Sequence, residues 1–306
     1  MLDDDLATVR EPAAWLLAEY TGSERFERRY AVETDPRVRA SLLVAVAEAD
    51  GPRGAVLARS ALGDAEPAVR AGAAVALAWA GQRLPEDSVA AVAVAFDAGD
   101  PLDGWSWAND TVAVLLARLV EPAALYAALA RSSHSDIRMS VAYSIVDAIG
   151  GGEGSASLVP LLGPLLTDPD RRVRLAGVHA AADAGPAAVA VADPLVAVVE
   201  PITRGDGADL DDARNALHVL IGIDDPRWRP LLVAAWGHGS AHDDAADVVR
   251  RVNVRPDPDL LAAAIARIEA LDGGTPMGRS RFQRAASPAR ERASLARLLA
   301  SWAEAE

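Results

Sequence analysis

Apolar residues recur along the chain at the spacing of one helix face, and the same spacing returns in eight successive segments. Each segment can be counted from an anchor position that, in most copies, directly precedes an arginine. The anchors are Val38, Val69, Ala108, Ile137, Val173, Ala213, Ala245 and Glu291. With the anchor as position zero, positions +4, +7 and +8 are mostly apolar, as in Leu42, Ala45 and Val46. Because positions 0, 4, 7 and 8 form one stripe of an α-helix, the pattern predicts a series of amphipathic helices.

Start and stop signals surround these stripes. An aspartate followed by proline, as in Asp35-Pro36, suits the first turn of a helix because the carboxylate caps free N–H groups and proline needs no donor there. Glycine follows several stripes, where a left-handed residue ends a helix. A second amphipathic segment lies upstream of most anchors, at 56–62, 89–96, 122–130, 158–166 and 260–271. The chain therefore reads as consecutive helical hairpins of about 30 to 45 residues each.

The openings Asp35-Pro36-Arg37-Val38-Arg39 and the runs of small residues such as Ala73-Ala74-Val75-Ala76-Leu77 resemble HEAT repeats, particularly the short repeats of phycobilisome lyases. The resemblance implies an all-α, right-handed alpha-alpha superhelix, an alpha-solenoid of about eight HEAT-like hairpins in a single domain over 1–306. Its expected parts are N-terminal capping helices at 1–34, repeats at 35–272, an Arg-rich loop at 273–287 and a C-terminal capping helix at 288–306. Trp15, Leu16 and Phe26 are expected to cover the N-terminal end of the stack.

The arginine after the anchor has two interpretations. In the family that the chain resembles, this arginine pairs with the acidic cap of a neighbouring repeat, and that structural role is the one we expect. The alternative is an exposed ladder that binds anions. The residues concerned are Arg39, Arg70, Arg138, Arg174, Arg214 and Arg292.

Composition and charge narrow the possible functions. A formal charge of -14 disfavours a nucleic-acid partner, because phosphates repel an acidic surface. The chain has no cysteine and no lysine, which excludes thiolate metal sites, disulfides and a Walker A loop. The first residues are acidic and no apolar run reaches spanning length, so we expect a cytoplasmic protein with no membrane contact. We expect no metal and no cofactor; the one metal-like pair, His238 and His242, is interrupted by Gly239.

The candidate binding residues lie opposite the core stripe, at positions +2, +5, +6 and +9. In HEAT-like stacks this side of the second helix lines the concave face, and polar residues are usual there. Here several of these positions are large and apolar or aromatic: Leu43, Val44, Val75, Met139, Tyr143, Val146, Leu175 and His179. Either they form an apolar channel that holds a partner segment, or the stack is wound tightly enough to bury them.

Two further segments are candidates for partner contact. Trp105 and Trp107 lie in a long linker, where they either contact a partner or fill an irregular junction between repeats. The Arg-rich segment from Arg279 to Arg292 either contacts an acidic partner or forms a solvated insertion.

The leading hypothesis is a non-enzymatic scaffold or regulator that binds another protein or peptide segment on its concave apolar face. The alternative is a HEAT-scaffold enzyme or small-ligand carrier, similar to bilin lyases or, less well supported, to alkylpurine DNA glycosylases, which need a cationic concave face. A ligand-sized pocket around Tyr143, His179 and His218 would favour the carrier or lyase. A long, open apolar trough would favour a peptide.

Overall fold

The computed structural model describes residues 1–97, 118–150, 155–204, 211–238, 245–252, 257–273 and 288–304. Regular secondary structure in these ranges is helical, apart from one isolated bridge between Arg83 and Val120. The predicted all-α class is therefore confirmed. The chain divides into two compact units, Met1–Leu161 (unit 1) and Leu162–Glu306 (unit 2).

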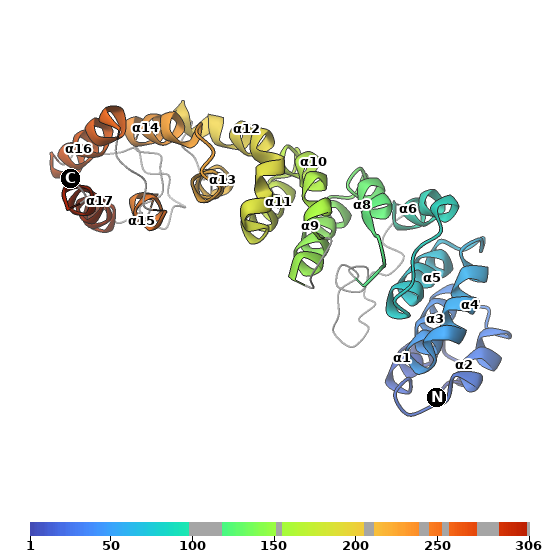
Figure 1. The fold of residues 1–306 in the computed structure, drawn as a ribbon. Coiled ribbons are helices and arrows are strands. Elements are labelled where there is room, and N and C mark those ends of the chain that lie inside the picture. The colour runs from blue at the N-terminus through green and yellow to red at the C-terminus, as the bar shows by residue number, and fades with distance from the viewer. Residues whose placement is uncertain are drawn as a thin grey trace. The chain divides into compact units, whose positions relative to one another are not determined.

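The helices of unit 1 alternate between two layers in chain order (Figure 1). Side by side in one layer are α1 (Ala7–Leu16), α3 (Pro36–Ala49) and α5 (Pro67–Trp79). Against them lie α2 (Ser23–Tyr30), α4 (Gly51–Ala61), the short 3-10 helix η1 (Glu86–Ser88), α6 (Val89–Asp97) and α8 (Ala123–Leu129). The unit ends with α9 (Ser135–Gly150) and the 3-10 helix η2 (Ser155–Leu161), which pack on α8 and on each other.

Unit 2 has the same alternation. One layer consists of α10 (Leu162–Leu166), α12 (Ala192–Thr203), α14 (Trp228–His238) and α16 (Pro258–Asp272), with the 3-10 helix η3 (Gly185–Val191) leading into α12. The other layer consists of α11 (Arg171–Asp183), α13 (Asp211–Gly222), α15 (Ala245–Arg251) and α17 (Pro288–Ala303). Each helix contacts the next one in its own layer, and α10, α12 and α16 each pack on the helix that follows them in the chain. The hairpin organisation predicted from the apolar stripes is therefore present within each unit.

The helix start signals act as the sequence predicted. The Asp35 carboxylate accepts the N–H groups of Arg37 and Val38 at 3.0 and 3.1 Å, and Pro36 occupies the first position of α3. Segment 158–166 differs from the prediction, because η2 covers its first half and α10 only its second. Pro160 lies inside η2 and lacks the N–H that a continuous α-helix requires there.

Helix α3 is enclosed by α1, α2, α4 and α5, which corrects part of the binding-face prediction. The side chains of Leu43 and Val44 on α3, and of Val75 on α5, are fully buried. These three residues belong to the core of unit 1, and a surface partner has no access to them. Tight packing of helices that are apolar on every face explains their burial.

A hydrogen-bonded loop precedes the first turn of α1, α3, α5, α9 and α11. In each loop, a side-chain oxygen five residues before the anchor accepts a hydrogen bond from the backbone N–H of the residue two positions later. In α1, Val9 takes the place of the anchor. The pairs are Asp4 with Leu6 (3.1 Å), Glu33 with Asp35 (3.0 Å), Asp64 with Glu66 (3.0 Å), Ser132 with His134 (3.1 Å) and Asp168 with Asp170 (2.8 Å). The arginine after the anchor closes the loop from the other side, since Arg70, Arg138 and Arg174 each donate to the carbonyl six residues earlier, at 2.7 to 2.9 Å.

Helix α1 carries the same loop, which the sequence analysis did not assign to it. Arg10 donates to the carbonyl of Asp4, six residues earlier, at 2.9 Å. The region expected to be a separate cap therefore begins with a helix that has the contacts of a repeat. Phe26 is buried as expected, whereas Leu16 is 47% exposed.

The arginine after the anchor also reaches forward to the next hairpin. Arg39 pairs with Asp64 at 2.7 Å and Arg174 pairs with Asp212 at 3.0 Å, so the expected structural pairing is confirmed for these two. Arg292 instead pairs with Asp272 at the end of the preceding helix, at 2.5 Å. Arg39 and Arg174 are largely buried in these pairs and so do not form an exposed anion ladder, whereas Arg292 is paired but about half exposed.

Glu33 connects α1 to the start of α3. Arg10 donates to both of its carboxylate oxygens at 2.8 Å. Burial raises the pKa of the Glu33 carboxyl, but hydrogen bonds from Arg10, from the backbone of Asp35 and from Arg29 outweigh burial and lower the pKa from 4.5 to about 2.

This lowered pKa predicts an acid-sensitive contribution to stability. A carboxylate with a depressed folded pKa stabilises the fold above its unfolded pKa and loses that effect as the pH falls toward the folded value. The free-energy advantage of wild type over Glu33→Gln should therefore shrink from about pH 5 down to about pH 2. Urea unfolding followed by circular dichroism measures it. Glu24→Gln, at a carboxylate that is 71% exposed, is the control, and a pH-independent difference for Glu33→Gln would contradict the prediction.

One helical run is long and apolar enough to cross a membrane by length and composition, contrary to the expectation that none would be. It is the continuous segment Gly185–Thr203, formed by η3 and α12. Its residues Leu195, Val199 and Ile202 are fully buried, and α12 packs on α13 and α14. One side of this run therefore belongs to the core of unit 2, whereas Val189 is 63% exposed.

Candidate functional site

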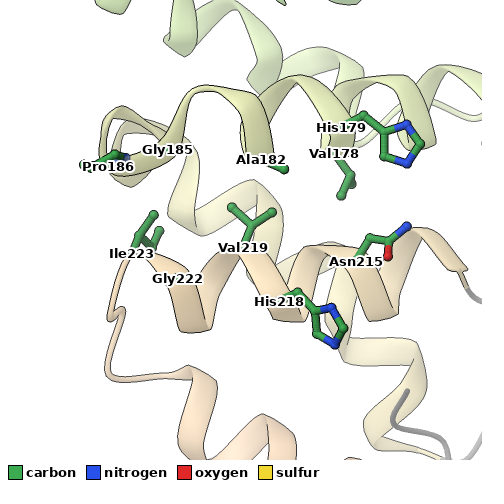
Figure 2. A pocket seen from close by; sticks show the side chains of 10 residues that line it. All are labelled: Val178, His179, Ala182, Gly185, Pro186, Asn215, His218, Val219, Gly222 and Ile223. Carbon is green, nitrogen blue, oxygen red and sulfur yellow. The ribbon is translucent and has the colours of Figure 1, made fainter. Parts of the chain in front are cut away.

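A groove lies between the neighbouring helices α11 and α13 in unit 2, and we call it the α11–α13 groove (Figure 2). Its volume is about 370 Å³. Helix α11 contributes Val178, His179 and Ala182, and helix α13 contributes Asn215, His218, Val219 and Gly222. Gly185, Pro186 and Ile223, which follow the ends of the two helices, complete the lining.

The repeat register explains why these residues line the groove. Val178, His179 and Ala182 are at positions +5, +6 and +9 from the anchor Val173, opposite the stripe that packs into the core. In α13, the residues at +2, +5, +6 and +9 from Ala213 are those that line the groove. Two successive copies therefore present the same side of their helices to one cavity.

Small residues keep one end of the groove open. Ala182 and Gly222 are exposed on facing helices, and a Cβ added at Gly222 would meet no atom within 4 Å. Gly185 has a φ of +54°, a left-handed conformation that ends the α11 turn and brings Pro186 across from Ile223. A bulky side chain at any of these positions would fill part of the cavity.

The polar groups of the groove are two imidazoles and one amide. His179 is exposed, and Asn215 and His218 are half-buried. Val219 and Ile223 point toward α11 and Pro186, whereas His218, next to Val219 in α13, points away from α11 (Figure 2). Polar and apolar side chains from both helices therefore line the groove.

The lining residues suit binding better than covalent chemistry. They include no hydroxyl, thiol, carboxylate or guanidinium group. Within the described ranges, no cluster of three or more potential metal ligands occurs. His242, one of the two histidines with metal-like spacing, lies outside the described residues. An apolar wall with a few polar groups is the usual composition of a ligand or peptide site.

The structure places the remaining predicted binding residues in both units. Tyr143 on α9 is 45% exposed, and Met139 and Val146 on the same helix are partly exposed. These three belong to unit 1. Leu175 is partly exposed on α11, one turn before His179, and is not part of the groove lining. Of the predicted residues, only His179 lines the α11–α13 groove. Tyr143 is not part of the cavity that His179 and His218 share.

Two predicted contact segments fall partly or wholly outside the described residues. Trp105 and Trp107 lie outside them, as does most of the Arg-rich segment before Pro288. In the described part of that segment, Glu291 is buried and Arg292 is paired with Asp272.

The sequence led to His218 as a possible pocket residue beside His179, but not to the other α13 residues of the groove. Counting +2, +5, +6 and +9 from Ala213 gives Asn215, His218, Val219 and Gly222. Large apolar residues at these positions are more conspicuous in the earlier copies. Ile223 and Pro186 lie after the helix ends and have no register from which to predict them.

A second hollow lies between α2 and α4 in unit 1. Its lining includes Glu27, Arg53, Val56 and Leu57, and its volume is about 520 Å³. Val56 is largely exposed, and Arg53 is paired with Glu24 at its edge. Unlike the α11–α13 groove, this hollow has charged side chains of both signs in its lining.

No protein-family model and no curated protein matches the chain. Among solved structures, one engineered protein from a structural genomics consortium aligns over 99% of this chain and 97% of its own, with 17% identity and a TM-score of 0.40. A second engineered protein from the same source aligns over 89% of this chain and 94% of its own, with 18% identity and a TM-score of 0.35. At these TM-scores the similarity carries no conclusion about superhelical geometry or function.

Proposed function

We propose that this chain is a HEAT-type alpha-solenoid that acts as a non-enzymatic interaction scaffold and binds a segment of another protein in the α11–α13 groove. The proposed right-handed superhelix is supported by the eightfold apolar register, by hairpin layers in each unit and by the recurring arginine loop. These features are what the resemblance to HEAT repeats leads us to expect.

The observation that carries the binding proposal is the position of the groove. It lies at the +5, +6 and +9 positions of two successive copies, on the side of the helices opposite the core. Its accessible apolar surface comes mainly from Ala182, Pro186 and Ile223, because Val178 is fully buried and Val219 is only 7% exposed. His179 and Asn215 supply hydrogen-bonding groups beside it. A partner side chain placed there would bury apolar surface, which contributes about 25 cal/mol per Å².

A substitution inside the groove tests this proposal. Ala182→Glu places a carboxylate at an exposed groove position on α11, without altering the core. We expect it to weaken peptide binding at least about tenfold, equivalent to about 1.4 kcal/mol. The measurement is fluorescence anisotropy with labelled amphipathic peptides of about five helical turns, each with one bulky apolar side chain and with acidic, neutral or basic flanks.

Ala266→Glu is the matched control, because Ala266 is exposed on α16 in the other layer. It should bind the same peptides as wild type does. If no peptide binds wild type, or if both variants bind equally well, the groove is not a peptide site and the proposed function is rejected.

A small-ligand carrier is the second candidate. The groove volume of about 370 Å³ lies within the range of small-molecule pockets, about 300 to 1,000 Å³. Stabilisation of wild type, but not of Ala182→Glu, by a drug-sized apolar compound in thermal unfolding would favour this candidate, provided that the peptides do not bind.

A further inference from the structure

The helix layer that forms the groove continues into a basic surface on α15 and α17. Counting from the anchor Ala245, positions +5 and +6 of α15 are Arg250 and Arg251. They correspond to His218 and Val219 of α13, the adjacent helix. The same count in α17 places Arg297 at position +6. The side that is apolar on α11 and α13 is therefore cationic on α15 and α17.

The charges on this surface do not cancel. Asp247 accepts a bidentate pair from Arg297, at 2.5 and 3.2 Å, and is 3.5 Å from Arg250. Arg250 and Arg297 are both well exposed despite this pairing, and Arg251 is exposed beside them. Among these described side chains, three arginines and one carboxylate leave a formal surplus of two positive charges.

The charged groups near the groove itself lie at its ends. Asp183 is exposed next to Ala182 at the end of α11. Asp211, at the start of α13, lies 3.4 Å from Arg171 and 3.8 Å from Arg214. The groove between these ends has no charged lining residue. An approaching segment thus meets an uncharged groove with aspartates at its ends, including the exposed Asp224 next to Ile223. The arginines of α15 and α17 lie beyond α13, in a protein that is acidic overall.

We propose that the occupant of the α11–α13 groove is an acidic peptide segment, whose apolar side chain enters the groove and whose carboxylates lie against Arg250, Arg251 and Arg297. This inference rests on the proposed function and names the chemistry of its partner. Packed helices are about 8 to 10 Å apart, so the carboxylates would follow the apolar residue by about two to three helical turns to reach α15 and by about four to reach α17.

The test compares peptides that share one apolar anchor and differ only in flanking charge. Acidic flanks should bind wild type about tenfold more tightly than neutral flanks, and basic flanks should bind most weakly. This preference should decline as added salt shortens the Debye length from about 10 Å at 0.1 M to about 3 Å at 1 M. Arg251→Gln should weaken the acidic peptide about threefold and leave the neutral peptide unchanged.

Arg204→Gln is the matched control, because it removes one exposed arginine at the end of α12 in the other layer. It should leave the charge preference intact. If acidic and neutral peptides bind equally well while Ala182→Glu still abolishes binding, this inference fails and the groove remains a peptide site. If no peptide binds, both proposals fail. Displacement of the acidic peptide by single-stranded DNA at comparable concentration would identify a phosphate-binding surface and also overturn the inference.

Discussion

Replacing Arg267 with leucine is expected to lower the free energy of unfolding by about 3 to 5 kcal/mol. The Arg267 guanidinium donates to both Glu291 oxygens, at 2.8 and 2.9 Å, and so joins α16 to α17. The two residues are only 7% and 4% exposed. The variant would leave the Glu291 carboxylate buried without its bidentate partner, and desolvation of that charge produces the cost.

The double variant Arg267→Leu/Glu291→Leu separates this cause from a general loss of packing. When both charges are replaced by apolar residues of similar size, no unpaired charge remains, and the cost is often small. We therefore expect the double variant to be more stable than Arg267→Leu alone in urea unfolding followed by circular dichroism. An equal or larger loss in the double variant would show that the ion pair itself supplies net stability.

The stripe of apolar positions predicted much of the fold because residues that must share one helix face are close together in the sequence. Leu42 and Val46 must share one helix face, and Asp35 and Pro36 mark where that helix begins. Such signals need no knowledge of distant contacts. The Arg39–Asp64 pair was expected only through the resemblance to HEAT repeats, because its two residues come from different hairpins.

The binding surface was harder to predict because alanine and valine fit both a core and an open face. Nothing in the sequence around Leu43 and Val44 shows that α1, α2, α4 and α5 enclose them. Glu291 presented the opposite difficulty. Its position at an anchor is that of a core residue, yet its partner Arg267 lies in a preceding helix that contains no motif.

The groove shows how far register can be used once helix packing is known. His179 was predicted because a count from Val173 places it away from the core stripe. The cavity beside it also requires small residues on the facing helix, such as Gly222, and a left-handed turn at Gly185. Whether a small residue leaves a cavity or permits a close approach depends on the distance between helices, which the sequence does not state. Gly72 illustrates the second case.

Gly72→Val is expected to lower the free energy of unfolding by about 3 kcal/mol, because it would overpack the contact between α5 and α3. A Cβ at Gly72 would lie 2.6 Å from the Cβ and 2.7 Å from the Cα of Ala40. Both distances are well inside van der Waals contact, and one of the atoms belongs to the α3 backbone. The helices would have to move apart, which would also loosen the buried contacts around Leu43.

Two further variants make the Gly72 result specific to this contact. Gly51→Ala introduces a Cβ at the start of α4, where the nearest atoms are 3.9 Å away, and it should change stability by no more than about 0.5 kcal/mol. Ala40→Gly in the Gly72→Val background removes the nearest clashing atom and should recover part of the loss, because the two sites are in contact and therefore not additive. Urea unfolding of the four proteins provides the comparison. Equal effects of Gly72→Val and Gly51→Ala, or no recovery with Ala40→Gly, would contradict the prediction. Either result would mean that the close approach of α3 and α5 does not require glycine at position 72.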